Sequence, residues 1–227
     1  MRLILPLLQD GLSYQSALAI QADWYEDHDL PLAAAALRSQ GRIAAGWKHS
    51  LALTNKGQVI AWGDNNYNQC DVPANLRAVA IAAGWNHSLA LTPEGRAVVW
   101  GDKGHNQHAV PRGLRAVAIA ADGCHCLALT PEGQVVAWGS NGYQQCDVPA
   151  NLRAVAIAAG CRHSLALTPE GRVVAWGDDE FHQCRVPDGL QAVAIAAGHN
   201  HSLALTQQGE VVAWGRDTKK TPNRQRT

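Results

Sequence analysis

Histidine and cysteine are the residues of this sequence best suited to chemistry, and both recur at a fixed spacing. One histidine position repeats every 38 residues, at His49, His87, His125, His163 and His201. A second position holds three cysteines and one histidine, a typical set of zinc ligands, at Cys70, His108, Cys146 and Cys184. Equivalent positions of packed repeats lie on the order of 10 Å apart, too far to share one ion. A catalytic residue is needed once rather than five times, so we predict structural roles for these side chains.

Three further cysteines form a second group around one of these histidines, namely Cys124, Cys126 and Cys161. They could bind a metal or undergo redox chemistry, although a free cysteine most often acts as a small buried side chain. No P-loop, dinucleotide fingerprint or nucleophile elbow is found. Adjacent His and Ser residues on a strand point to opposite faces, so the repeated His-Ser steps are not catalytic dyads. We predict a protein that is not an enzyme and has no metal and no cofactor.

Composition narrows the class of protein further. Lysine and arginine (19) balance aspartate and glutamate (19), which makes nucleic acid an unlikely partner. No apolar run approaches the roughly 20 residues needed to span a bilayer, and the N-terminus lacks the features of a signal peptide. We therefore expect a cytoplasmic protein with reduced thiols and no membrane contact. Frequent glycine (21) and tryptophan (8) favour many short strands joined by tight turns.

An internal repeat is the main feature of the chain. Isoleucines 38 residues apart open five similar units, at 43–80, 81–118, 119–156, 157–194 and 195–215. Within the second unit, the turn signal Thr92–Gly95 joins a strand near 89–91 to another near 98–100. The stretch 76–82 is interpreted as a third strand and 68–72 as a short fourth one. Four short strands per repeat predict an all-β chain of five four-stranded β-propeller blades.

The repeated pattern A-G-x-x-H-S-L-A-L-T-x-x-G-x-V-x-A-W-G resembles the repeat of the regulator-of-chromosome-condensation family. This resemblance implies a propeller, commonly of seven blades. Five units leave three possibilities: a smaller ring, an open array, or homo-oligomerisation through exposed blade edges. The family name also implies an alternative function, guanine-nucleotide exchange on a small GTPase. The units carry no long insertion that could act as a wedge loop for that reaction.

The two ends of the chain differ from the repeats. Residues 1–42 contain Ser13 as a candidate helix N-cap, apolar residues at helical spacing after it, and an Ala-rich stretch at 32–39. This pattern predicts a small N-terminal helical cap for the array. Residues 216–227 contain five basic residues and one acidic residue. We interpret this tail as a disordered basic end, with a nucleic-acid contact as the alternative.

The positions that differ between repeats predict the binding surface. Two loops vary. The first is the pair of residues before each repeated histidine. The second is the segment after each Trp-Gly, in which the fourth residue has an aromatic or imidazole side chain. Exposed aromatic side chains at loop tips are typical anchors of protein interfaces; the alternative is that they only fill turns. The candidate partner-binding residues are Trp47, Lys48, Tyr67, Trp85, Asn86, His105, Tyr143, Phe181 and His199.

The chain is also similar to bacterial β-lactamase inhibitor proteins of the propeller type, including the Val-Pro after the second variable loop. This similarity implies contact with a partner protein through Trp47, Tyr67, Trp85 and Tyr143. The sequence therefore predicts a protein-binding repeat scaffold whose partner is another protein. A self-assembling structural repeat protein is a further alternative.

Overall fold

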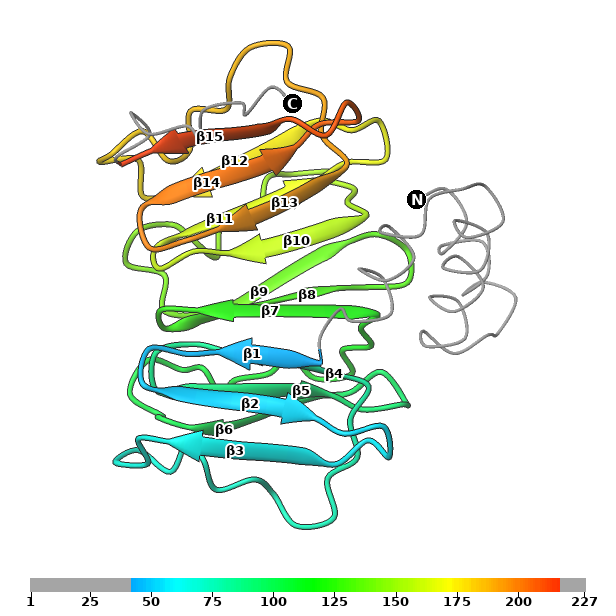
Figure 1. Cartoon of the computed structure of the whole chain (residues 1–227), viewed down its shortest axis with the longest axis vertical. Helices are drawn as coiled ribbons and strands as arrows, with labels where there is room; N and C mark the ends of the chain where they lie inside the picture. Colours follow the sequence, from blue (N-terminus) through cyan, green and yellow to red (C-terminus); the bar gives the residue numbers. More distant parts are fainter. Residues whose placement is uncertain (1–41, 217–227) are drawn as a thin grey trace, which may run out of the picture.

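The computed structural model describes residues 42–216, in which fifteen strands form five antiparallel sheets (Figure 1). We number the sheets 1 to 5 in chain order. Sheets 1 and 2 contain β1 (Ile43–Ala45), β2 (His49–Leu53), β3 (Val59–Gly63), β4 (Ala80–Ala83), β5 (His87–Leu91) and β6 (Ala97–Gly101). Sheets 3 and 4 contain β7 (Ala118–Asp122), β8 (His125–Leu129), β9 (Val135–Gly139), β10 (Ala156–Ala159), β11 (His163–Leu167) and β12 (Val173–Gly177). Sheet 5 contains β13 (Ala194–Ala197), β14 (His201–Leu205) and β15 (Val211–Gly215).

One sheet forms from each repeat, which confirms the all-β prediction and the five units. The predicted helical cap and all but the first residue of the basic tail lie outside the described residues. Across residues 42–216 there is no helix of any kind, and therefore none long and apolar enough to cross a membrane.

The predicted fourth strand is not found, because residues 68–72 form turns. The side chain of Asn65 donates from Nδ2 to Asp71 Oδ1 and accepts the Cys70 amide at Oδ1, both at 2.8 Å. Asn68 has a φ of 62°, which a strand does not allow. The bond to Asn65 uses the Cys70 amide, a backbone group that a fourth strand would need, and each sheet has three strands. The strand expected at 76–82 is also shorter and begins at Ala80.

The hairpin turns form as predicted. In sheet 2 the Thr92 amide donates to the carbonyl of Arg96, and the Gly95 amide donates back to the carbonyl of Thr92, both at 2.9 Å. Gly95 has a φ of 76°, a conformation that glycine adopts without steric cost. The same Thr-x-x-Gly turn connects the second and third strands of the other sheets.

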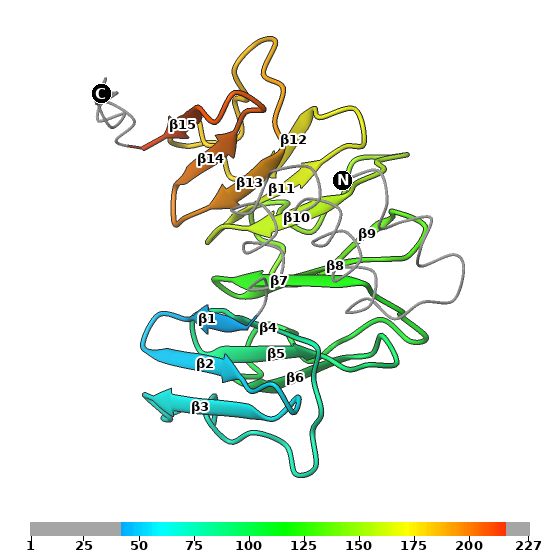
Figure 2. The ribbon, with the colours of Figure 1, turned by 45° about the vertical axis from the view of Figure 1, so that its right-hand side comes forward.

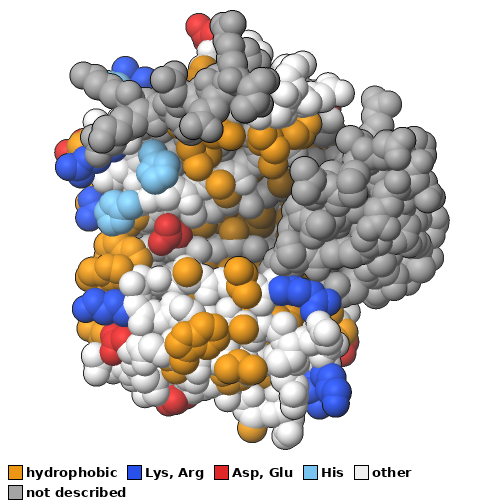
Figure 3. Space-filling view, in the orientation of Figure 1, with side chains coloured by type: hydrophobic (Ala, Val, Ile, Leu, Met, Phe, Trp, Pro, Cys, Tyr) orange, Lys and Arg blue, Asp and Glu red, His pale blue; other side chains and the backbone are white. Residues whose placement is uncertain are grey.

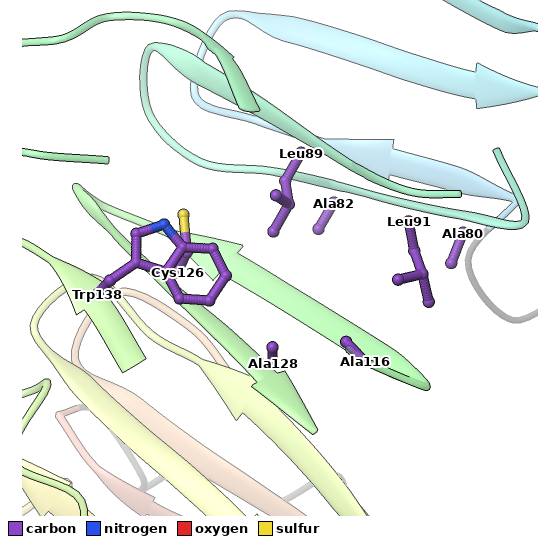
Figure 4. Close-up of a cluster of buried hydrophobic side chains, with 8 residues drawn as sticks. All are labelled: Ala80, Ala82, Leu89, Leu91, Ala116, Cys126, Ala128 and Trp138. Atoms are coloured by element: carbon purple, nitrogen blue, oxygen red, sulfur yellow. The ribbon is translucent and has the colours of Figure 1, made fainter. Parts of the chain in front are cut away.

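The core lies between consecutive sheets. Figure 4 shows one such layer, in which Leu89 of β5 packs against Trp138 and Cys126 of sheet 3, whereas Leu91 lies nearer to Ala116. Alanines fill the remaining space, so the small and large side chains of facing sheets interlock. A fully buried leucine contributes about 1.5–3 kcal/mol relative to an exposed one. Stacking of neighbouring sheets is therefore what stabilises a sheet that has only three strands.

The sheets follow one another along a curved stack (Figures 1 and 2). Their first strands contact each other in chain order, from β1 through β4, β7 and β10 to β13. The curvature brings a loop of sheet 2 next to a loop of sheet 5. The outward faces of sheets 1 and 5 are not covered by other described residues, since Trp62 and Val211 remain half exposed.

Candidate functional site

Both sets of variable loops lie at the same end of the sheets, on the left in Figure 1. The first set, the inner loops, joins the first strand to the second at 46–48, 84–86, 123–124, 160–162 and 198–200. The second set, the outer loops, follows the third strand at 64–68, 102–106, 140–144 and 178–182. Backbone bonds tie the sets together: Asp64 N donates to Lys48 O, and Asp178 N to Arg162 O, at 2.8 and 2.9 Å. We call this end the variable face.

Three predicted binding residues meet in one stack on the variable face. The rings of Trp47 and Trp85 lie 5.5 Å apart, and those of Trp85 and His199 lie 5.7 Å apart and nearly parallel, at 14°. The backbone holds both tryptophans in place, because the Trp47 and Trp85 amides donate to the carbonyls of Gly84 and Gly123 in the next sheet. We call Trp47, Trp85 and His199 the aromatic stack.

The aromatic stack is open to solvent and bordered by charge. Trp47 is 64% exposed, Trp85 is half-buried and His199 is exposed. The Lys48 ammonium lies 5.0 Å from the Trp47 ring centroid, within reach of a cation–π interaction. In the space-filling view, hydrophobic side chains gather at this end beside Lys or Arg and His side chains (Figure 3). Asn86, the remaining predicted residue of the inner loops, is half-buried and accepts the Asp102 amide at its carbonyl.

The outer loops of sheets 1 to 4 each place a ring at the same position, on a braced backbone. In sheet 1 the buried Gln69 accepts the Tyr67 amide at Oε1, at 2.9 Å, and its Nε2 donates to Asp64. The same glutamine contact holds the amides of His105, Tyr143 and Phe181. Since the side chain of a buried residue fixes each loop, little conformational entropy is lost when a partner contacts the ring.

Cations pack on two of these rings, and sequence reasoning did not select them. The Arg162 guanidinium lies 4.4 Å from the Tyr143 ring centroid, and that of Arg216 lies 4.7 Å from Phe181. Arg162 belongs to the inner loop of the sheet that follows Tyr143, so the contact joins two sheets. His105 instead faces a carboxylate, with 3.7 Å between its Nδ1 and Asp102 Oδ2.

Asp122 is a further residue of the variable face that sequence reasoning missed. It stands where the other four repeats have glycine, which was the available signal. It ends β7, where the Gly123 amide donates to its Oδ1 at 2.6 Å. Burial raises the pKa of the Asp122 carboxyl, while the Gly123 amide and the nearby His199 lower it in part. Asp122 therefore adds an acidic group beside the aromatic stack.

The repeated histidines lie between sheets, which confirms their predicted structural role. His49, His125 and His163 each contact a serine hydroxyl of the next sheet through Nε2, at 2.9, 3.0 and 3.0 Å. Burial lowers the pKa of all three imidazoles, to about 3 for His125 and about 4 for His163. These neutral, enclosed rings are not available to a ligand. The tryptophans of the Trp-Gly steps also pack between sheets, as predicted, except for Trp62.

The cysteines do not converge. Cys70, Cys146 and Cys184 each donate to a carbonyl of their own loop, at 3.2–3.3 Å. His108, the fourth candidate zinc ligand, lies 3.2 Å from the carbonyl of Gly101. Among the described residues, no three His, Cys, Asp or Glu side chains are placed to hold a metal ion.

The second cysteine group is spread between buried and half-buried positions. Cys126 lies 3.3 Å from Nε2 of His87, in the place of the usual serine. Cys161 is buried and Cys124 is half-buried, and all three thiols are free. Burial raises the pKa of the Cys161 thiol to about 12 and also raises that of Cys124. These thiols are protonated at neutral pH, whereas the thiolate is the reactive form.

Comparison with known proteins agrees with this architecture. The family model "Regulator of chromosome condensation (RCC1) repeat" matches residues 39–69, 78–107, 116–145, 154–183 and 192–219. The ultraviolet-B receptor UVR8 of Arabidopsis thaliana is 40% identical over 53 residues, which are 22% of this chain and 12% of the receptor.

Solved structures extend the likeness to the whole array. Prp20p from Saccharomyces cerevisiae is 27% identical with a TM-score of 0.67, over 78% of this chain and 57% of Prp20p. Human WBSCR16 is 25% identical with a TM-score of 0.64, over 76% of this chain and 61% of WBSCR16. The chain thus corresponds to somewhat more than half of each of these proteins.

The structural relatives include proteins described by what they bind. Prp20p was solved in a study of its binding to Gsp1p and histones, and the same yeast protein, also called RCC1, was solved with Kap60 bound to it. The five family matches follow the five sheets described above, which are therefore RCC1-type propeller blades. With these matches over more than half of its length, the chain belongs to the regulator of chromosome condensation (RCC1) repeat family.

Proposed function

We propose that this protein is a non-enzymatic scaffold that binds another protein through its variable face. The observation that carries the proposal is the aromatic stack, in which Trp47, Trp85 and His199 from three blades form one solvent-open surface. Aromatic side chains clustered near the centre of a surface, with charges at the rim, are the usual composition of a protein-binding hot spot. Lys48 and Asp122 supply those charges.

The division of roles within each repeat supports the same proposal. The side chains that repeat without change, such as His163, Leu165 and Trp176, are buried between blades and hold the array together. The side chains that vary lie on one face and are braced by the buried glutamines. Prp20p, with the same fold, has protein partners, which adds support by analogy.

The exchange-factor alternative has no specific support among the described loops. The four connections between blades, 64–79, 102–117, 140–155 and 178–193, have the same length. None is extended into a segment that could enter a GTPase. We therefore favour binding over catalysis of nucleotide release.

The proposal is tested by placing a photo-reactive cross-linking residue at Lys48, on the variable face, in otherwise wild-type protein. The matched control carries the same residue at Arg96, an exposed position in the hairpin turn at the opposite end of sheet 2. Each protein is exposed to lysate of the source cells, irradiated and analysed by mass spectrometry. We expect a defined adduct with one protein from position 48 and none from position 96.

The double variant W47A/W85A provides the second arm of this experiment. It should lose the adduct while its thermal unfolding stays cooperative, because both side chains lie at the surface of the face. An adduct that forms equally from position 96, or that survives in W47A/W85A, would remove the variable face as the binding site.

A further inference from the structure

Consecutive blades are joined by one repeated set of contacts. At the boundary of sheets 3 and 4, His125 Nε2 lies 3.0 Å from Ser164 Oγ, and Ser164 donates to the carbonyl of Gln145 at 2.8 Å. Trp176 Nε1 donates to that same carbonyl at 2.9 Å. Its indole ring lies in one buried cluster with Leu127 and Leu129 of sheet 3. A blade therefore offers histidine and leucines on its downstream face, and serine and tryptophan on its upstream face.

The same set joins the other blades of the described array. Sheets 1 and 2 use His49, Ser88 and Trp100, and sheets 4 and 5 use His163, Ser202 and Trp214. Sheets 2 and 3 use His87 and Trp138, with Cys126 in place of serine. This interface has thus formed four times from side chains of one kind, so its two halves are complementary wherever they occur.

The upstream face of sheet 1 carries one half of this interface without the other. Ser50 and Trp62 occupy the positions of Ser164 and Trp176. Trp62 is 53% exposed, whereas Trp176 is 8% exposed. Within residues 42–216, neither the Trp62 indole nor the Ser50 hydroxyl has a hydrogen-bond partner of this kind. Ile60 on the same sheet is also more than half exposed.

The downstream face of sheet 5 carries the other half. His201 occupies the position of His125, and it contacts no serine hydroxyl within the described residues. Leu205 is 37% exposed, whereas its equivalent Leu167 in sheet 4 is 1% exposed. Val211 is half exposed, whereas Val173 is buried. The array of residues 42–216 thus presents both halves of one interface, one at each of its ends.

We propose that a second copy of this chain covers these faces, with sheet 5 of one copy packed on sheet 1 of the next. His201 then bonds to Ser50 of the next copy, and the face of that copy that carries Trp62 covers Leu203 and Leu205. This is a head-to-tail, heterologous contact, which continues until a ring closes or a filament forms. It lies apart from the variable face, so self-association and partner binding are separable.

The test uses two full-length variants that each block one face. Trp62→Arg places a charge on the upstream face and leaves sheet 5 intact, whereas Leu205→Arg blocks the downstream face and leaves sheet 1 intact. Both replaced side chains are exposed in the single chain, so each variant should fold, as circular dichroism verifies. Glu94→Arg, at an exposed turn, is the control for the added charge. Molar mass is measured by sedimentation velocity over a wide concentration range.

Wild type and Glu94→Arg should form oligomers of at least two copies, and each face variant alone should be monomeric. An equimolar mixture of the two face variants should form a one-to-one dimer, because one intact interface is restored. Only a head-to-tail contact predicts this complementation. If wild type stays monomeric at every concentration, the proposal is overturned. Coverage of these faces by residues 1–41 of the same chain would give that result. A mixture that stays monomeric while wild type associates also overturns it.

Discussion

The His125 imidazole and the Ser164 hydroxyl meet across the boundary of sheets 3 and 4, with 3.0 Å between Nε2 and Oγ. The serine has one proton and donates it to the carbonyl of Gln145. The imidazole must therefore be the donor in their bond, which places its proton on Nε2. The other nitrogen, Nδ1, is buried and has no hydrogen-bond partner. Each blade boundary of this type thus holds a neutral imidazole of fixed tautomer.

Removing the hydroxyl at this boundary should destabilise the array. Ser164→Ala leaves the buried Nε2–H group of His125 without an acceptor, which costs about 1–3 kcal/mol of unfolding free energy. The matched control is Ser50→Ala at the equivalent position of sheet 1, where no histidine faces the hydroxyl within the described residues. Both changes are made in the Leu205→Arg background, in which the proposed contact of Ser50 with a second copy is blocked. Urea denaturation of both variants gives the two values, and equal losses would contradict the role assigned to the histidine contact.

The boundary of sheets 2 and 3 offers the reverse experiment. Cys126 replaces serine there; its thiol lies 3.3 Å from His87 Nε2 but makes no hydrogen bond to the carbonyl of Gln107. Cys126→Ser should supply the missing bond, as Ser88 does to Gln69 one blade earlier. We expect a gain of about 1 kcal/mol in the free energy of unfolding. A loss of stability in the same urea assay would show that the thiol is preferred for its size.

Local features of this fold were predictable from the sequence, whereas those that depend on the curvature of the array were not. The Thr92–Gly95 turn and the five repeats follow from short-range patterns. The absence of a fourth strand depends on the side chain of Asn65, which binds the backbone amide of Cys70 and the carboxylate of Asp71. The contact between Trp85 and His199 joins sheets 2 and 5. Only the bend of the stack decides that these two predicted residues meet.

The inner loops require glycine at one position, and its loss should be costly. A Cβ atom at Gly160 would lie 2.2 Å from Cε1 of His163 and 2.7 Å from the carbonyl oxygen of Gly198. Neither group can move without breaking a blade contact. Gly160→Ala should therefore lower the free energy of unfolding by at least about 1–3 kcal/mol. Gly142→Ala is the control, since nothing lies within 4 Å of its added methyl, and it should change stability by less than about 0.5 kcal/mol. Thermal unfolding distinguishes the two.

Sheet 3 shows how this requirement can be avoided. Asp122 stands at the position of Gly160, but β7 continues through it and a tight turn follows at Gly123, whose φ is 47°. Asp122→Gly should therefore not stabilise the blade, although it restores the repeat consensus. It should instead remove the carboxyl group beside His199. A marked rise in melting temperature for this variant would contradict this interpretation of the turn.

Stability should fall in mild acid because of the histidines between blades. Burial lowers the pKa of His87 and His163 to about 4 and of His125 to about 3, from 6.5 in the unfolded chain. Below pH 6.5 the unfolded chain therefore binds protons that the folded array cannot, so the free energy of unfolding decreases as pH falls from 6.5 to about 4. Over this window, from pH 6.5 to about 4, each of the three histidines accounts for a loss of about 3 kcal/mol, since one pKa unit is about 1.4 kcal/mol.

Urea denaturation in steps between pH 7.5 and pH 4 measures this loss. His163→Gln keeps a side-chain N–H that can reach Ser202 but cannot titrate. Its unfolding should therefore take up about one proton fewer within this window, so the free energy of unfolding should depend less steeply on pH. Above pH 7 the titration of these histidines should no longer affect the stability of either protein. If wild type is equally stable at pH 7 and pH 4.5, or if His163→Gln retains the full slope, the imidazoles are not the groups that set acid sensitivity.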